Sequence, residues 1–275
     1  MSRSEPSGLQ ILLKTIPARA YPRVVGFARE RTWVFFDIMF PLVGTFTMVF
    51  VYQGLHAPKA YIGFAIMGGA MLAFWQNVLW SMAMQFSWDR DNGTLELYAV
   101  APTSFEAVLL GMAAGAMLST SARALIIIAL GTLAFGVSFS AAGLAPAVGI
   151  FLLTLAGLYC LGMLLASLFL FYTREAWHLS EALQEPVYFL SGLYFPVKAL
   201  PAYVAGGASL LPLTLGLDAM RQLLLPAGLP VFIPVGVEAL LVALQIPLYG
   251  AAAYVALRRM EALARRDGKL TSRWS

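Results

Sequence analysis

The sequence predicts an all-helical integral membrane protein with six transmembrane helices, an N-terminal interfacial helix and short re-entrant helices between the fifth and sixth spans. Of its 275 residues, 60% are apolar and only 12% are charged, and the mean hydropathy is +0.78. A soluble domain carries about 25% charged residues, so much of this surface must face lipid. A soluble enzyme, a disordered chain and a disulfide scaffold are therefore excluded.

The N-terminal segment, residues 1–32, is predicted to be cytoplasmic and to end in an amphipathic interfacial helix near 21–32. Six cations alternate with apolar side chains in this segment. Such a segment lies on a membrane surface, with its apolar side chains in the lipid and its cations toward anionic headgroups.

Six apolar runs then predict a transmembrane domain over 33–257, since each span needs about 20 residues. Five prolines divide the outer region 196–230 into pieces too short to cross a bilayer, which is typical of re-entrant or interfacial helices. The predicted spans are 33–54, 59–86, 105–136, 146–171, 177–195 and 231–257.

The distribution of cations predicts that both termini are cytoplasmic, including a basic tail over 258–275. This orientation places 14 of the 18 Lys and Arg residues inside and three outside, with Arg123 within the membrane. The basic residues flank apolar runs and form no groove with stacking aromatics, so the expected contacts are membrane lipids and not nucleic acid.

No catalytic motif is found in the sequence. His56 and His178 lie in loops on opposite predicted faces, so no metal site is expected. The acidic segment 89–93 could hold Mg²⁺ for lipid chemistry, but an Asp/Asn/Gly turn leaving a helix explains it better because no second acidic cluster exists. The phosphate-binding pattern GxxxxGK[ST] is absent, so the chain is not expected to hydrolyse ATP by itself.

The cytoplasmic loop 89–104 is the longest polar stretch between the first and last spans. Thr94 to Val100 is predicted to form a two-turn helix that lies across the membrane and ends before Pro102. A short apolar helix in this position suits docking of another protein, and an ordinary interfacial loop helix suits the pattern equally well.

Three charged residues fall inside the predicted spans: Asp37, Arg123 and Glu238. Arg123 lies mid-membrane, where an unpaired charge costs several kcal/mol; it either meets an anionic substrate or pairs with Glu238 or Asp37, and we favour the pair. Asp37 is interpreted as a cap against Arg31 or Arg29. Glu238 is the better candidate for a polar path.

Two separated segments of the sequence form a recognisable pattern. The first runs from Asp91 to Leu97 and continues in Ala101–Ser104. The second contains Glu185–Pro186, Phe189–Gly192, Tyr194–Pro196, Leu200–Pro201 and Leu211–Thr214, with Asp218 and Arg221. Together, in this order and spacing, they resemble type-2 permeases of ATP-binding-cassette exporters, particularly the multidrug, daunorubicin-like and lipo-oligosaccharide branches.

The resemblance implies a permease subunit of a bacterial inner membrane that forms a homodimer and binds two separate ATPase subunits, which hold the ATP and Mg²⁺. It implies no cofactor, metal or catalytic residue on this chain. By this resemblance, the loop after the second span is the ATPase-coupling helix, and the outer region 196–230 contains the family's short outer helices. The coupling residues are Gly93, Thr94, Leu95, Glu96, Leu97, Tyr98 and Pro102, and the outer residues are Pro212, Thr214, Asp218 and Arg221.

A gate is predicted in the fifth span, where Pro186 and the Ser191–Gly192 pair permit kinks. The alternative is a static kink that only shapes the bundle. The hypothesis places the outer gate at the two-fold axis of the dimer. Its residues are Pro186, Tyr188, Phe189, Ser191, Gly192, Phe195 and Pro196.

The sequence thus predicts an exporter permease for a drug-like amphipath, a lipid or a lipid-linked glycan. Two rivals stay open at this point: an intramembrane lipid-modifying enzyme that uses Asp89 and Asp91, and an ion-coupled secondary transporter.

Overall fold

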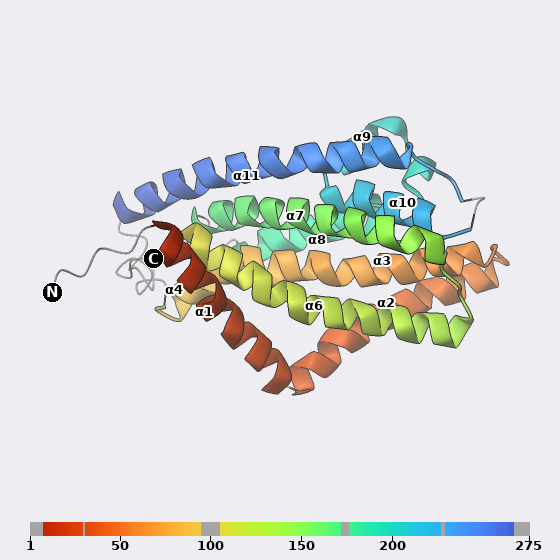
Figure 1. Cartoon of the computed structure of the whole chain (residues 1–275), viewed down its shortest axis with the longest axis horizontal. Coiled ribbons are helices and arrows are strands. Elements are labelled where there is room, and N and C mark those ends of the chain that lie inside the picture. The colour runs from red at the N-terminus through yellow and green to blue at the C-terminus, as the bar shows by residue number, and fades with distance from the viewer. Residues whose placement is uncertain (1–7, 30, 95–104, 172–175, 227–228, 267–275) are drawn as a thin grey trace.

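A computed structural model describes residues 8–29, 31–94, 105–171, 176–226 and 229–266. Every element in these ranges is helical, and the long helices form one elongated bundle (Figure 1). The elements are α1 (Gly8–Arg29), α2 (Arg31–Gly54), α3 (Ala60–Gln76), η1 (Asn77–Ala83), α4 (Gln85–Asp91), α6 (Phe105–Phe135), α7 (Ala141–Phe171), α8 (Ala176–Leu190), η2 (Val197–Ala199), α9 (Ala202–Ala208), α10 (Pro212–Leu224) and α11 (Val235–Arg266).

Five helical stretches of the described chain are long and apolar enough to cross a membrane, so the chain is a multi-pass membrane protein. They are Val34–Gly54, Ala60–Asp89, Glu106–Phe135, Ala141–Phe169 and Val235–Met260. The predicted fifth span, 177–195, was wrong at its C-terminal boundary. Helix α8 ends at Leu190 and has 15 residues, which is about 22 Å of helix.

Helix α3 is the centre of the bundle. All residues from Ile62 to Trp75 are buried, because α2, α6 and α10 pack around the helix. Its apolar residues accordingly occupy every face of the helix, as expected for a fully enclosed element. Small residues allow the close approach: a Cβ on Gly69 would lie 1.7 Å from Thr45 Oγ1 of α2.

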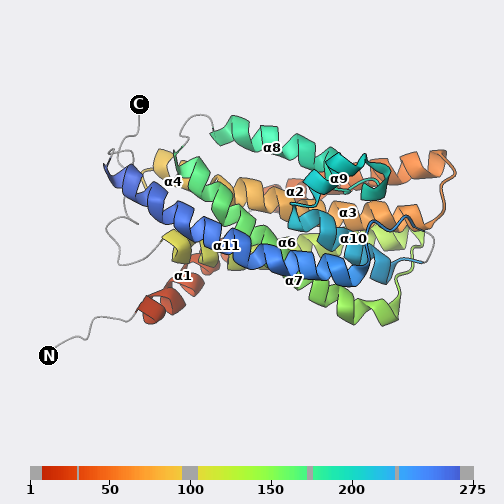
Figure 2. The same ribbon diagram turned by 90° about the horizontal axis from the view of Figure 1, so that it is seen from above.

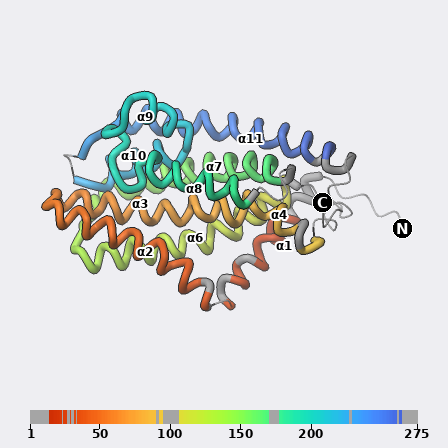
Figure 3. Tube along the Cα trace, turned by 180° about the vertical axis from the view of Figure 1, so that it is seen from behind, coloured from red at the N-terminus to blue at the C-terminus, as the bar shows by residue number. Residues whose placement is uncertain are grey.

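Helix α1 is longer than predicted, and the expected start near residue 21 was wrong. The helix begins at Gly8 and includes Pro17 and Pro22. It packs along α6, where a Cβ on Gly111 would lie 2.9 Å from the Ile16 carbonyl oxygen. This packing offsets the backbone hydrogen bonds that the two prolines remove. Helix α1 ends at Arg29 and α2 begins at Arg31, and the two helices diverge as a V (Figure 3).

The two ends of the bundle differ. The start of α1 and the ends of α4 and α11 lie at one end of the bundle. Helices α9 and α10 lie at the other end (Figure 2). Helix α10 is amphipathic in sequence, yet the residues from Pro212 to Arg221 are all buried. This end is therefore closed by a short helix that packs into the bundle against α7 and α11.

Candidate functional site

A cavity of about 710 Å³ lies between α2, η1, α6 and α8, and is termed here the α2–α8 cavity. Its described lining is Phe36, Asp37, Phe40, Pro41, Gln76, Asn77, Trp80, Ser81, Trp88, Arg123, Trp177, Glu181, Gln184 and Glu185. A second cavity of about 630 Å³ extends toward α1 and shares Asp37, Asn77, Trp80, Ser81, Trp88 and Arg123. The shared residues form the wall between the two cavities.

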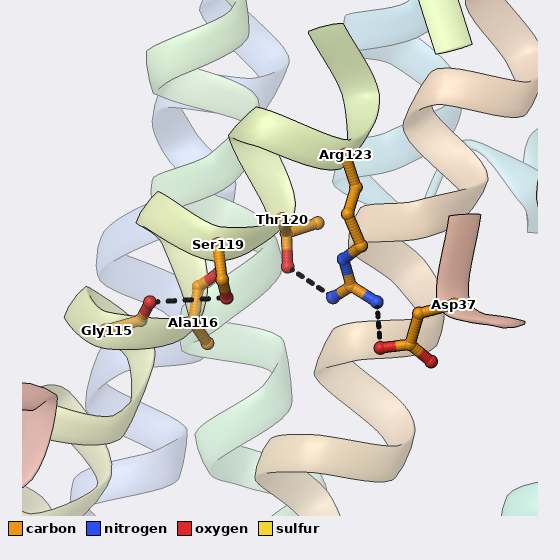
Figure 4. A network of polar contacts seen from close by, with 6 residues as sticks. All are labelled: Asp37, Gly115, Ala116, Ser119, Thr120 and Arg123. Carbon is orange, nitrogen blue, oxygen red and sulfur yellow. Dashed lines mark hydrogen bonds and ion pairs between the residues drawn. The ribbon is translucent and has the colours of Figure 1, made fainter. Parts of the chain in front are cut away.

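The Asp37–Arg123 ion pair is part of the wall between the two cavities, and Figure 4 shows its contacts. Arg123 Nη1 lies 2.6 Å from Asp37 Oδ2, and Nη2 donates to Thr120 Oγ1 at 2.9 Å. The side chain of Arg123 is 11% exposed and that of Asp37 is 45% exposed. The favoured interpretation, a structural ion pair, is confirmed, and of its two candidate partners the structure selects Asp37. The interpretation of Asp37 as only a cap of its own helix was wrong, because Asp37 reaches across to α6.

A π-helical turn supplies the back of the cavity. In η1 the backbone is wound with i→i+5 hydrogen bonds, as in Met84 N to Leu79 O at 3.1 Å. Such turns concentrate at functional sites because they interrupt regular packing. Asn77 is 5% exposed, and its Oδ1 has no hydrogen-bond partner. An unsatisfied buried acceptor beside a cavity is available to a ligand.

Helix α8 forms the opposite wall with a polar face. Trp80 Nε1 donates to Gln184 Oε1 at 2.5 Å, and Trp177 Nε1 donates to Glu181 Oε1 at 2.8 Å. The two indole rings meet edge to face with centroids 4.7 Å apart. These contacts hold α8 against η1.

Sequence reasoning did not find this wall. The signal was present: Trp177, Glu181 and Glu185 recur every four residues, and Gln184 and Tyr188 flank them, so they share one helix face. The gate predicted in this helix rested on its kink-permitting residues, and its polar face was not considered.

A buried arginine holds the outer end together. Arg221 Nη1 donates to the carbonyl oxygen of Gly192 at 2.5 Å, and Nη2 donates to those of Phe64 and Leu193 at 2.8 Å. The guanidinium carbon lies 3.2 Å from the centroid of the Phe64 ring. Arg221 therefore joins α10, the start of α3 and the segment after α8.

A carboxylate cluster lies beside that arginine, on α10 and α11. Gln222 Nε2 lies 3.0 Å from both Asp218 Oδ2 and Glu238 Oε2, and 2.8 Å from the Ile233 carbonyl oxygen. Glu238 is fully buried. Of the two candidate partners of Arg123, Glu238 was wrong, because Glu238 contacts Gln222 in this outer cluster.

The other predicted outer residues are also buried in α10. Pro212 occupies the first turn of the helix, where a missing N–H costs nothing. Thr214 is buried, and its hydroxyl has no hydrogen-bond partner. Neither residue lines the α2–α8 cavity.

The predicted coupling residues lie only partly in the described structure. Thr94 N donates to the Asp89 carbonyl oxygen at 2.7 Å, and Gly93 has a φ of 71°. The predicted turn leaving a helix is therefore confirmed. Leu95, Glu96, Leu97, Tyr98 and Pro102 lie outside the described residues.

Asp89 ties this turn to the N-terminal helix. Its Oδ2 lies 4.0 Å from Arg19 Nη2. Burial lowers the pKa of Arg19 from its ordinary value, and the carboxylate of Asp89 opposes that shift. In the described part of the chain, no three His, Cys, Asp or Glu side chains gather closely enough to hold a metal ion.

The predicted gate residues fall into two environments. Pro186 is exposed within α8, Phe189 is 57% exposed, and Tyr188 OH accepts from Gln76 Nε2 at 3.0 Å. Ser191 Oγ donates to the Val187 carbonyl oxygen at 2.5 Å.

Gly192 corrects the kink prediction. Its φ is 79°, and it lies two residues after Leu190, the last residue of α8. It therefore ends the helix and does not loosen its interior. Phe195 is half-buried and Pro196 is buried beyond it, so these residues belong to the outer connection and not to α8.

The fold and these features agree with the comparison to known proteins. The family model of the ABC-2 type transporter matches residues 23–225, about three quarters of the chain. The chain belongs to the ABC-2 type transporter family. The match runs from the second half of α1 to the end of α10, so it contains both walls of the α2–α8 cavity of this permease. No curated protein matches the sequence.

Proposed function

We propose that this ABC-2 permease is the membrane subunit of an ATP-binding-cassette exporter that moves an amphipathic substrate outward. The observation that supports the proposal is the family match over residues 23–225. Two separate ATPase subunits bind ATP and Mg²⁺ and supply the energy. Two permease chains form a homodimer in the bacterial inner membrane.

The chain crosses the membrane six times in this proposal. The sixth crossing is α8 together with the segment 191–196, since α8 alone covers about 22 Å of a hydrocarbon core of roughly 30 Å. An even number of crossings agrees with α1 beginning and α11 ending at the same end of the bundle (Figure 1). That end carries Arg19, Arg258 and Arg259, and these cations support its assignment to the cytoplasmic side.

The outer end is closed by α9 and α10 as re-entrant helices. Arg221 attaches α10 to Gly192, so a movement of α8 is transmitted to this end. The segment 191–196 is accordingly proposed as the outer gate.

The α2–α8 cavity is the proposed substrate entry site. It lies in the half of the bundle that contains Asp37 near the start of α2 and Trp177 near the start of α8. Substrate enters from the cytoplasmic side, and closure of the ATPases moves the coupling loop so that the two ends of the bundle change their relative position.

The coupling loop provides the experiment. The variant Leu95→Asp/Leu97→Asp should reduce Mg-ATP hydrolysis by the complex that co-purifies with the permease by at least tenfold, because charge replaces the apolar side chains that contact the ATPase. The control Leu210→Asp places the same charge on an exposed side chain at the opposite end, and its hydrolysis should be unchanged. Unaltered ATPase binding and hydrolysis in the double variant would refute the proposed coupling.

A further inference from the structure

We propose that the α2–α8 cavity binds an amphipathic organic cation, a substrate class that rests on the proposed export function. The inference comes from three properties of the cavity: its charge balance, its aromatic lining and its position within a membrane-spanning bundle.

The charge balance of the cavity is negative. The described residues that line it include three carboxylates, on Asp37, Glu181 and Glu185, and one cation, Arg123. Asp37 and Arg123 neutralise one another at 2.6 Å. Two carboxylates on α8 are left without a compensating charge in the lining.

Neither carboxylate of α8 is neutralised by a strong ion pair. Glu181 accepts from Trp177 Nε1 at 2.8 Å, and its other oxygen lies 3.9 Å from Nδ1 of the exposed His178. Glu185 has no ion-pair partner among the described residues. The side chain of Glu181 is 55% exposed and Glu185 is also exposed, so both carboxylates are open to a ligand in the cavity. A cationic ligand would supply the counter-charge that this wall lacks.

The aromatic lining favours the same ligand. Three tryptophans and two phenylalanines line the cavity: Phe36, Phe40, Trp80, Trp88 and Trp177. The N–H groups of Trp80 and Trp177 already donate to Gln184 and Glu181, so these rings meet a ligand through their π surfaces. Such surfaces attract an organic cation more strongly than a neutral or anionic group.

An anion fits this cavity poorly. Two of the guanidinium nitrogens of Arg123 are occupied by Asp37 and Thr120, and only Nε lacks a partner. A ligand carrying negative charge would also face Glu181 and Glu185. The volume of about 710 Å³ lies within the range of roughly 300–1,000 Å³ that is usual for drug-sized ligands.

The experiment uses two ions of the same shape and opposite charge. Tetraphenylphosphonium and tetraphenylborate are titrated into the purified permease in lipid nanodiscs, and binding is followed by quenching of tryptophan fluorescence. Empty nanodiscs report the partition of each ion into lipid, which is subtracted because the membrane dipole potential favours the anion.

Tetraphenylphosphonium should bind at least tenfold more tightly than tetraphenylborate. The variant Glu181→Gln/Glu185→Gln should weaken binding of the cation by about tenfold or more, which corresponds to about 1.4 kcal/mol. The control Glu106→Gln makes the same change at a carboxylate of α6 that does not line the cavity, and it should bind as the parent does.

Equal or tighter binding of tetraphenylborate, or an unchanged affinity in the double variant, would overturn the inference. A melting curve of each variant shows whether it is folded, and a misfolded double variant is replaced by Glu185→Gln alone. If tetraphenylphosphonium does not bind while the permease still stimulates its ATPase, the substrate class fails and the export function stands. If both are absent, the export function fails as well.

Discussion

The contacts of Arg221 allow a quantitative prediction for Arg221→Met. Methionine keeps the apolar volume of the stem but removes the hydrogen bonds to the carbonyl oxygens of Gly192, Leu193 and Phe64. Arg221 is 3% exposed, so water cannot replace the lost donors without reorganising this end of the bundle.

The expected loss in the free energy of unfolding is about 3–5 kcal/mol. Each hydrogen bond to a charged group contributes roughly 1.5–3 kcal/mol, while removing the buried guanidinium relieves a desolvation cost of several kcal/mol. The lost hydrogen bonds to the three carbonyl oxygens dominate the balance. At roughly 2–4 °C per kcal/mol, the melting temperature should fall by on the order of 10 °C.

The assay uses the single cysteine of the chain. Cys160 is half-buried in α7, so a thiol-reactive fluorogenic dye labels it fully only on unfolding. The control is Arg258→Met, which removes an exposed guanidinium whose carbon lies 4.5 Å from the centroid of the Tyr254 ring. The melting temperature of this variant should change by no more than about 2 °C, because exposed contacts of this kind contribute little. A change of the same small size in Arg221→Met would refute the reasoning.

Three further predictions follow from single contacts. Asp37→Asn should lower the melting temperature more than Arg123→Met, because the former leaves a nearly buried cation unpaired and the latter leaves a half-exposed carboxylate that water can solvate. Gly192→Ala should destabilise the protein by about 1–3 kcal/mol, because φ is 79° and the new Cβ would lie 2.4 Å from Cγ2 of Val197. The control Gly207→Ala, where the new Cβ would meet open space, should be neutral or slightly stabilising. Tyr203→Cys, with the native cysteine removed, should react with an impermeant thiol reagent added outside intact cells, because this side chain is 82% exposed on α9.

Each of these predictions has a contradicting result. Equal melting temperatures for the two ion-pair variants would show that the pair is fully solvated. An unaffected Gly192→Ala variant would mean that the helix end adapts freely. Labelling of Tyr203→Cys only after the cells are opened would place α9 on the cytoplasmic side and reverse the proposed orientation.

The sequence alone determined the class of protein and the positions of most spans. Spans are set by local composition, because any segment of about 20 apolar residues satisfies its backbone hydrogen bonds only as a helix in lipid. The ranges 33–54, 105–136 and 146–171 therefore correspond closely to α2, α6 and α7. The turn at Gly93 was also predictable, because a positive φ favours glycine whatever surrounds it.

The tertiary structure alone decided which polar groups meet. Arg123 had two candidate partners by sequence, and packing of α2 against α6 selected Asp37. Glu238 met Gln222 of α10 instead, since α10 folds back into the bundle. Nothing in the sequence indicated that Arg221 would donate hydrogen bonds to three carbonyl oxygens from two distant segments. Such contacts depend on how helices pack, which the order of residues along one helix does not specify.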